Sequence, residues 1–113
     1  MPRAIILTTQ GQVRIGSPSK LEDFQKIVGG YIQTVWVRPT SAREGAILVV
    51  NEEGLLKGLP RNILAERFLT ESVGPLNQPI VGDVFIVAKA GEDFGDAPRW
   101  VEEWADRQEV RRG

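Results

Sequence analysis

Two runs of five residues, Ala46–Val50 and Val84–Ala88, carry an apolar side chain at every position. Successive residues of a β-strand point to opposite faces of its sheet, so a strand with no polar position must be covered on both faces. A chain of 113 residues has the length of one ordinary domain and can enclose such a core. The two runs therefore predict the central strands of a single sheet.

Three shorter β-rich segments complete the predicted sheet. Arg3–Thr9 and Gln12–Gly16 flank Gln10-Gly11, a two-residue link of the hairpin type. Tyr31–Val37 is aromatic and β-branched, as strands prefer. Within it Trp36 shares a face with two other strand residues, and we expect its indole to lie in the core.

Segment 19–30 has the pattern of the first helix. Ser19 and Glu22 fit a capping box, in which a side chain at each end of the first turn binds the backbone of the other. Gly29 is placed for a left-handed cap at the helix end, and Gly30 then allows a sharp turn into the next strand. A glycine pair after a helix is not a phosphate loop, because phosphate loops precede a helix.

Two further helices are predicted. One begins at Pro60–Asn62 and runs to about Leu69 or Thr70, with Pro60 in its first turn or Asn62 as its cap. The other begins at Asp96–Arg99, with Asp96 as cap, and has Arg111-Arg112 near its C-terminus.

The predicted order is ββ-α-ββ-α-β-α, a single small α+β domain with a sheet of about five strands and helices packed on it. Residues 1–90 form the core, and residues 91–113 add a C-terminal helix that carries tryptophans. The Gly- and acid-rich segment 89–96 is expected to be a loop between them.

The composition excludes several kinds of chemistry. The chain has no cysteine and no histidine, so it lacks thiolate metal sites, His-based nucleophile pairs and the usual general base at neutral pH. A net charge of −1 does not favour a nucleic-acid binder, although a local basic face stays possible. No run approaches the ~20 apolar residues of a membrane span, and the first apolar run is too short for a signal peptide. We expect a cytoplasmic protein without a cofactor.

The four residues Asn51, Glu52, Glu53 and Gly54 follow the first apolar run and have two interpretations. They form a turn if the Asn side chain binds the backbone two residues on and Gly supplies a positive φ. They form a small acid/base or hard-metal site if the turn brings the carboxylates together and recruits Asp83. The turn is the simpler interpretation, since no known ligand spacing is present.

Three further polar residues also have alternative roles. Asn62 caps a helix or presents its amide to an anionic ligand. Asp83, after Gly82, closes a tight turn or joins a ligand site. Tyr31 packs its ring and leaves its hydroxyl at the surface, or donates a hydrogen bond in a pocket.

Trp100 and Trp104 are four residues apart on the last predicted helix. They dock on the protein's own sheet, or they pack on another subunit or partner, since aromatic anchors dominate protein interfaces. Base stacking is less favoured because the surrounding helix is acidic.

Three sequence segments together resemble a known family: "IVGGYIQTVWV", "ILVVNEEGLLKGLPRN" and "IVGDVFIVA". In this order they resemble the uncharacterised family catalogued as domain of unknown function 3846, found in bacteria, bacteriophages and other mobile elements. The likeness runs from about Leu21 to Ala88. The N-terminal hairpin also fits, while the tail after Lys89 resembles an extension.

The resemblance implies no established activity, but it implies which positions recur in the family. They correspond here to Gly29, Gly30, Tyr31, Asn51, Glu52, Gly54, Pro60, Asn62, Gly82 and Asp83. One departure is Gln33, where the family often has an acid, so a mechanism that needs a carboxylate there does not extend to this chain.

The leading hypothesis is a small non-enzymatic accessory protein that binds a protein partner or itself, of the phage and mobile-element type. In it, the loops at 51–62 and 82–83 form one rim and the Trp helix forms a partner surface. One alternative is a carboxylate-dependent enzyme or small-ligand site in which Glu52, Asn62 and Asp83 converge. Another is weak nucleic-acid binding through a local basic face.

Overall fold

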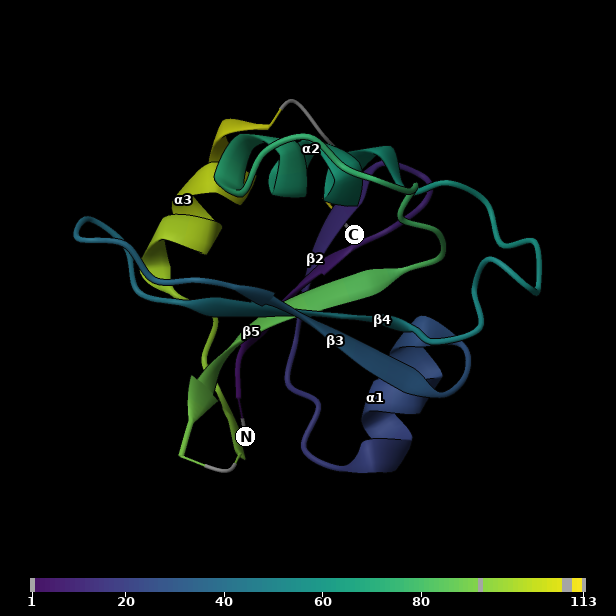
Figure 1. Ribbon diagram of the computed structural model, residues 1–113. Helices are drawn as coiled ribbons and strands as arrows, with labels where there is room; N and C mark the ends of the chain where they lie inside the picture. The colour runs from purple at the N-terminus through teal and green to yellow at the C-terminus, as the bar shows by residue number, and fades with distance from the viewer. Residues whose placement is uncertain (1, 92, 109–110, 113) are drawn as a thin grey trace.

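The centre of the fold is an antiparallel sheet with strands in the spatial order β3-β4-β5-β1-β2 (Figure 1). These strands are β1 (Ala4–Leu7), β2 (Gln12–Gly16), β3 (Ile32–Val37), β4 (Ala46–Asn51) and β5 (Val84–Ala90). The structure is a computed structural model that describes residues 2–91, 93–108 and 111–112. The α+β class and the sheet predicted from the sequence are confirmed.

The two apolar runs are the central strands, as predicted. Every residue of β4 is buried, and so are the first four residues of β5. The two strands pair in the register Leu48↔Ile86, with Val49 opposite Phe85. Alternate side chains of both strands therefore enter two separate cores, one on each face of the sheet.

Helices on both faces enclose these cores. In Figure 1, α2 (Ile63–Ser72) and α3 (Arg99–Arg107) lie above the sheet, and α1 (Leu21–Val28) lies below it. The larger core packs Phe68 of α2 and Trp104 of α3 against the α2 side of the sheet. The smaller core packs the apolar side of α1 against the opposite side.

Two additional short strands were not predicted. β6 (Asp93–Gly95) pairs with the end of β5, and β7 (Arg111–Arg112) pairs in parallel with β2. The prediction of a plain loop at 89–96 is wrong because Phe94 packs on Phe24 of α1, with ring centroids 5.1 Å apart. This contact draws the segment into a hairpin.

The first helix begins one residue later than the predicted cap implies. The N-cap of α1 is Lys20, not Ser19, and the reciprocal carboxylate belongs to Asp23 rather than Glu22. The Asp23 carboxylate accepts hydrogen bonds from the backbone N–H groups of Ser19 and Lys20 at 2.9 and 3.1 Å. These bonds hold the pKa of Asp23 below its usual range. The left-handed cap at Gly29 is confirmed, with φ of 82°.

The third helix also begins and ends differently from the prediction. Its N-cap is Pro98, while Asp96 accepts a hydrogen bond from the backbone N–H of Arg3 at 2.7 Å. Asp96 therefore connects the chain to β1 instead of capping α3. Because α3 ends at Arg107, the pair Arg111-Arg112 lies in β7 and not at the helix C-terminus.

The prediction that Trp36 lies in the core is wrong, since its side chain is 48% exposed. β3 is an edge strand, and the eight-residue helix α1 is too short to cover its far end. The indole lies over Gly45 instead, where an added Cβ would come within 2.5 Å of the ring.

Within the described residues, no helix combines the length and apolarity needed to cross a membrane.

Candidate functional site

Asn62 is completely buried, and both the oxygen and the nitrogen of its side-chain amide bind backbone groups. Its side-chain oxygen accepts from the N–H of Ala65 at 3.0 Å and so caps α2. Its Nδ2 donates to the carbonyl oxygens of Leu7 at 2.8 Å and Gly82 at 2.9 Å. The amide thus joins β1, α2 and the segment before β5, and it is not presented to a ligand.

Gly82 and Asp83 form a bend, rather than the predicted tight turn, beside Asn62. Gly82 has a φ of 79°, a conformation that favours glycine, and an added Cβ would lie 2.9 Å from the Leu59 side chain. The Asp83 carboxylate accepts from the backbone N–H of Thr9 at 2.9 Å. This bond fixes the β1–β2 turn to the start of β5.

Asn51 forms the predicted bond to the backbone two residues on, and it also holds the end of α1. The prediction of a positive φ at Gly54 is wrong, because the left-handed glycine of this segment is Gly58, with φ of 66°. The Asn51 side-chain oxygen accepts from the N–H of Glu53 at 2.8 Å, and its Nδ2 donates to the carbonyl oxygen of Val28 at 3.1 Å. A Cβ on Gly30 would lie 2.9 Å from this Nδ2. The Gly30 position therefore allows the close approach of Asn51 to the helix end.

The 52–59 turn, which follows Asn51, is braced by its own backbone. The backbone N–H of Lys57 donates to the carbonyl oxygen of Glu53 at 2.9 Å, and the N–H of Leu59 donates to the carbonyl oxygen of Gly54 at 3.0 Å. An added Cβ on Gly54 would meet the Val81 side chain at 2.7 Å, so the turn packs closely on the segment before β5. The predicted rim of segments 51–62 and 82–83 is thus one continuous region of the molecule.

This turn displays apolar side chains to solvent. Leu56 is 88% exposed and Leu55 is 52% exposed. Tyr31, the residue before β3, is also largely exposed. It lines an open groove of about 530 Å³ between α1 and the turn. The remaining lining residues are Glu22, Gln25, Lys26, Gly30 and Lys57.

The carboxylates proposed for an acid/base site do not meet Asn62. Glu52 is exposed, with its backbone N–H bound to the carbonyl oxygen of Tyr31 at 2.8 Å. Asp83 binds Thr9, and the Asn62 amide binds backbone groups only. Across the described part of the chain, no three His, Cys, Asp or Glu side chains are grouped to hold a metal ion.

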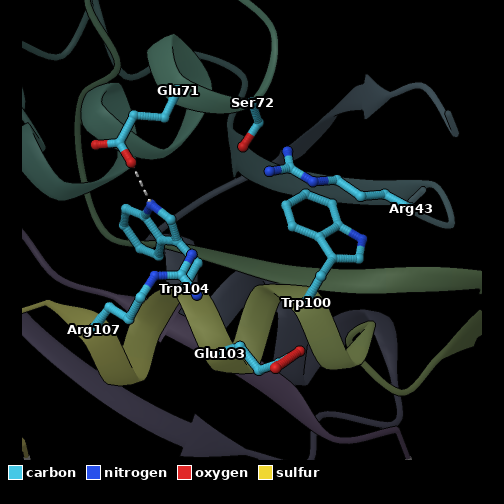
Figure 2. Close-up of a pocket in the computed structure, with 7 residues that line it drawn as sticks. All are labelled: Arg43, Glu71, Ser72, Trp100, Glu103, Trp104 and Arg107. Atoms are coloured by element: carbon cyan, nitrogen blue, oxygen red, sulfur yellow. Dashed lines mark hydrogen bonds between the residues drawn. The ribbon is translucent and has the colours of Figure 1, made fainter.

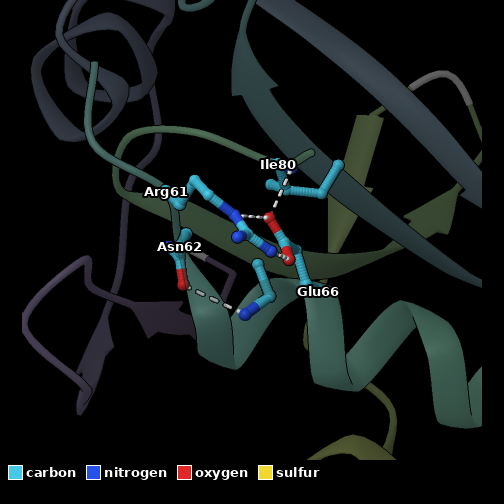
Figure 3. Close-up of polar contacts among 5 residues, drawn as sticks. Arg61, Asn62, Glu66 and Ile80 are labelled. Carbon is cyan, nitrogen blue, oxygen red and sulfur yellow. Dashed lines mark hydrogen bonds and ion pairs between the residues drawn. The ribbon is translucent and has the colours of Figure 1, made fainter. Parts of the chain in front are cut away.

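An ion pair beside the rim was not predicted from the sequence. The Arg61 guanidinium binds both carboxylate oxygens of Glu66, at 3.1 and 2.5 Å (Figure 3). Glu66 also accepts from the backbone N–H of Ile80 at 3.1 Å. The bond to Arg61 is the main reason that the pKa of Glu66 lies below its ordinary value. Through its bond to Ile80, Glu66 also holds α2 to the segment that precedes β5.

The tryptophans of α3 pack on the protein's own core. Trp100 stacks on Phe68 with ring centroids 5.6 Å apart, and Trp104 meets the same ring edge-on at 5.2 Å. The indole N–H groups donate to the Glu44 carbonyl oxygen at 2.9 Å and to the Glu71 carboxylate at 3.0 Å. Their N–H groups are therefore occupied within the chain.

A pocket of about 270 Å³ remains beside these indoles (Figure 2). Arg43 lies over the Trp100 ring, 4.8 Å from its centroid, and occupies the face that a cationic ligand would use. The other lining residues are Glu71, Ser72, Glu103, Trp104 and Arg107. Because Arg43 covers the Trp100 ring and the Trp104 N–H binds Glu71, the aromatic groups of this pocket already have partners within the chain.

The exposed leucine pair and the groove were not identified from the sequence. Leu55 and Leu56 are of a residue type that usually lies in the core. They are exposed here because the turn that carries them directs them to solvent. The signal that was available is their position directly after Gly54 and before Lys57-Gly58, within a segment rich in turn residues.

The fold and the groove define a small α+β domain with a central antiparallel sheet, helices on both faces and a braced turn at one end. The chain belongs to the family described as Domain of unknown function (DUF3846), whose family model matches residues 2–109. The match confirms the resemblance and extends over the N-terminal hairpin and α3. Comparisons with curated proteins and with solved structures find no match.

Proposed function

We propose that this protein is a small non-enzymatic binding module that recognises a partner protein through the groove between α1 and the 52–59 turn. A phage or mobile-element setting and a cytoplasmic location belong to the same proposal. The setting rests on the family resemblance, and the location rests on the sequence.

The observation that carries the proposal is the exposure of Leu55 and Leu56 on a turn that is held rigid. A leucine that is 88% exposed contributes little to folding, yet hydrogen bonds order the backbone of the turn that carries it. Because this backbone is already ordered, the turn loses little backbone entropy when its apolar side chains enter an interface. The exposed Tyr31 lines the groove together with Lys57 of this turn and adds an aromatic anchor of the kind that dominates protein interfaces.

The charges of the groove indicate the chemistry of the partner. Lys26 and Lys57 line it together with Glu22, so two cations face one anion. Lys57 lies 3.9 Å from Glu53, at a distance that leaves it able to exchange partners. We expect a partner segment with one or two apolar side chains next to a carboxylate.

Selection from a random peptide library on the purified protein tests this proposal. We expect enriched peptides with the stated composition, and we expect Leu56→Asp to weaken their binding by about tenfold or more. Val73→Asp is the matched control, because Val73 is 65% exposed but lies at the end of α2, outside the groove. Titration calorimetry gives the affinities.

Two results would contradict the proposal. One is a set of enriched peptides that bind Leu56→Asp and the parent protein equally well. The other is a turnover of any substrate class that disappears in Glu52→Gln or Asp83→Asn, since that would favour the carboxylate-dependent enzyme instead.

A further inference from the structure

β3 is an edge strand of the sheet, and within the described residues no strand pairs with its outer side (Figure 1). Its six residues, Ile32–Val37, include no charge and no proline. Natural edge strands are usually protected by a charge, a proline or a bulge, because a flat uncharged edge pairs with another chain. β3 has none of these features.

The opposite edge of the sheet is protected. β2 carries Arg14 at its centre, and β7 pairs with Gln12 and Val13 along its outer side. The contrast shows that the open edge is specific to β3 and is not a general property of the sheet.

The β3–β4 register determines which backbone groups of β3 point toward the open edge. The N–H of Glu52 donates to the carbonyl oxygen of Tyr31, which extends that ladder by one pair. Alternate residues of an antiparallel strand direct their N–H and C=O groups to opposite sides. The backbone groups of the odd-numbered residues of β3 therefore bind β4. The N–H and C=O groups of Ile32, Thr34 and Trp36 point outward from the sheet edge.

We propose that β3 pairs with β3 of a second copy of this chain, antiparallel, about a two-fold axis through Thr34. In this register Thr34 of one copy lies opposite Thr34 of the other, and Ile32 lies opposite Trp36. Each of these pairs consists of outward-directed residues, so each exchanges two backbone hydrogen bonds. The same strand supplies every donor and every acceptor, which makes a second copy the fitting occupant of this edge.

The side chains of the edge are also self-complementary. The pairing covers Trp36, whose indole is 48% exposed, with Ile32 of the other copy on the same face of the joined sheet.

Substitution of Thr34 by residues of opposite charge tests the pairing and its register. Sedimentation equilibrium of the full chain, from submicromolar to several hundred micromolar, is expected to show a monomer–dimer equilibrium. Thr34→Lys and Thr34→Glu each place like charges directly opposite, and we expect each to raise the dimer Kd by about tenfold or more. An equimolar mixture of the two variants is expected to form a heterodimer.

Two further variants separate a pairing defect from a folding defect. Thr34→Val keeps the outward N–H and is expected to leave the dimer intact. Thr34→Pro removes that N–H from both copies while an outward position of an edge strand tolerates proline, so we expect a folded monomer by circular dichroism. A protein that stays monomeric at every concentration would overturn the inference. So would a dimer that Thr34→Lys and Thr34→Pro leave unchanged.

Discussion

The side-chain amide of Asn62 donates a hydrogen bond to the carbonyl oxygen of Leu7 at 2.8 Å, across 55 positions of sequence. The same amide caps α2 through Ala65 and binds the carbonyl oxygen of Gly82. A single buried side chain therefore holds the end of β1, the start of α2 and the approach to β5 together. Its place in the fold explains why this residue is an asparagine, which has both an acceptor and a donor.

Asn62→Ala is expected to lower the free energy of unfolding by about 2–4 kcal/mol, from the lost cap and the carbonyl oxygens left unpaired. Urea denaturation followed by circular dichroism measures this change. Asn77→Ala is the matched control, because Asn77 is exposed, and we expect it to change stability little. Equal effects of the two substitutions would show that the buried amide has no special role.

Gly30→Ala is expected to destabilise the protein by about 1–2 kcal/mol, because the new Cβ would lie 2.9 Å from the Asn51 Nδ2. The Asn51 amide cannot move without losing its bond to Val28. In an Asn51→Ala background the same substitution is expected to be neutral or stabilising, since alanine then only restricts the unfolded chain. A double-mutant cycle in urea measures the difference, and purely additive effects would refute the contact.

Glu66→Gln is expected to reduce stability at neutral pH by no more than about 1 kcal/mol, because the Arg61 partner is largely exposed and the pair is screened. The pKa of Glu66 is lower in the folded state than its ordinary value of 4.5. Its ionised form therefore stabilises the fold above that value, and the contribution is lost as the pH falls through the folded pKa. The difference in free energy of unfolding between parent and variant should be constant near neutral pH and should disappear as the pH falls below about 4.5. Thermal unfolding across this range measures it, and a gap that widens in acid would contradict the assignment.

Trp104→Ala is expected to cost about 3–5 kcal/mol, because the indole is 4% exposed and packs against Phe68. Trp36→Ala removes the same side chain from a half-exposed position and should cost much less when measured at low protein concentration. Denaturant unfolding of both variants provides the comparison. A small effect at Trp104 would indicate that the α3 indoles serve an interface rather than the core.

The central part of the fold was predictable because it depends on residue patterns that act locally. The apolar runs at Ala46–Val50 and Val84–Ala88 require burial on both faces, and this requirement made them neighbours at the centre of the sheet. The glycine cap at Gly29 and the asparagine cap at Asn62 follow from backbone chemistry near each helix end. The errors at Ser19 and Asp96 arose because these side chains have other partners: the Ser19 hydroxyl binds the Asp23 carboxylate, and Asp96 binds the backbone N–H of Arg3.

The surface and the roles of the polar residues depended on contacts between distant segments. Trp36 has a position in its strand that a core residue could occupy. It is exposed because β3 lies at the sheet edge and α1 is too short to cover it. Asn51, Asn62 and Asp83 are suited equally to a ligand site and to backbone bonds, and the folded chain uses them for Val28, Leu7 and Thr9. The sequence by itself thus determined which segments form strands and helices, because that choice rests on local periodicity. Only the tertiary structure decided which side chains remain exposed for binding, because exposure depends on every segment that packs nearby.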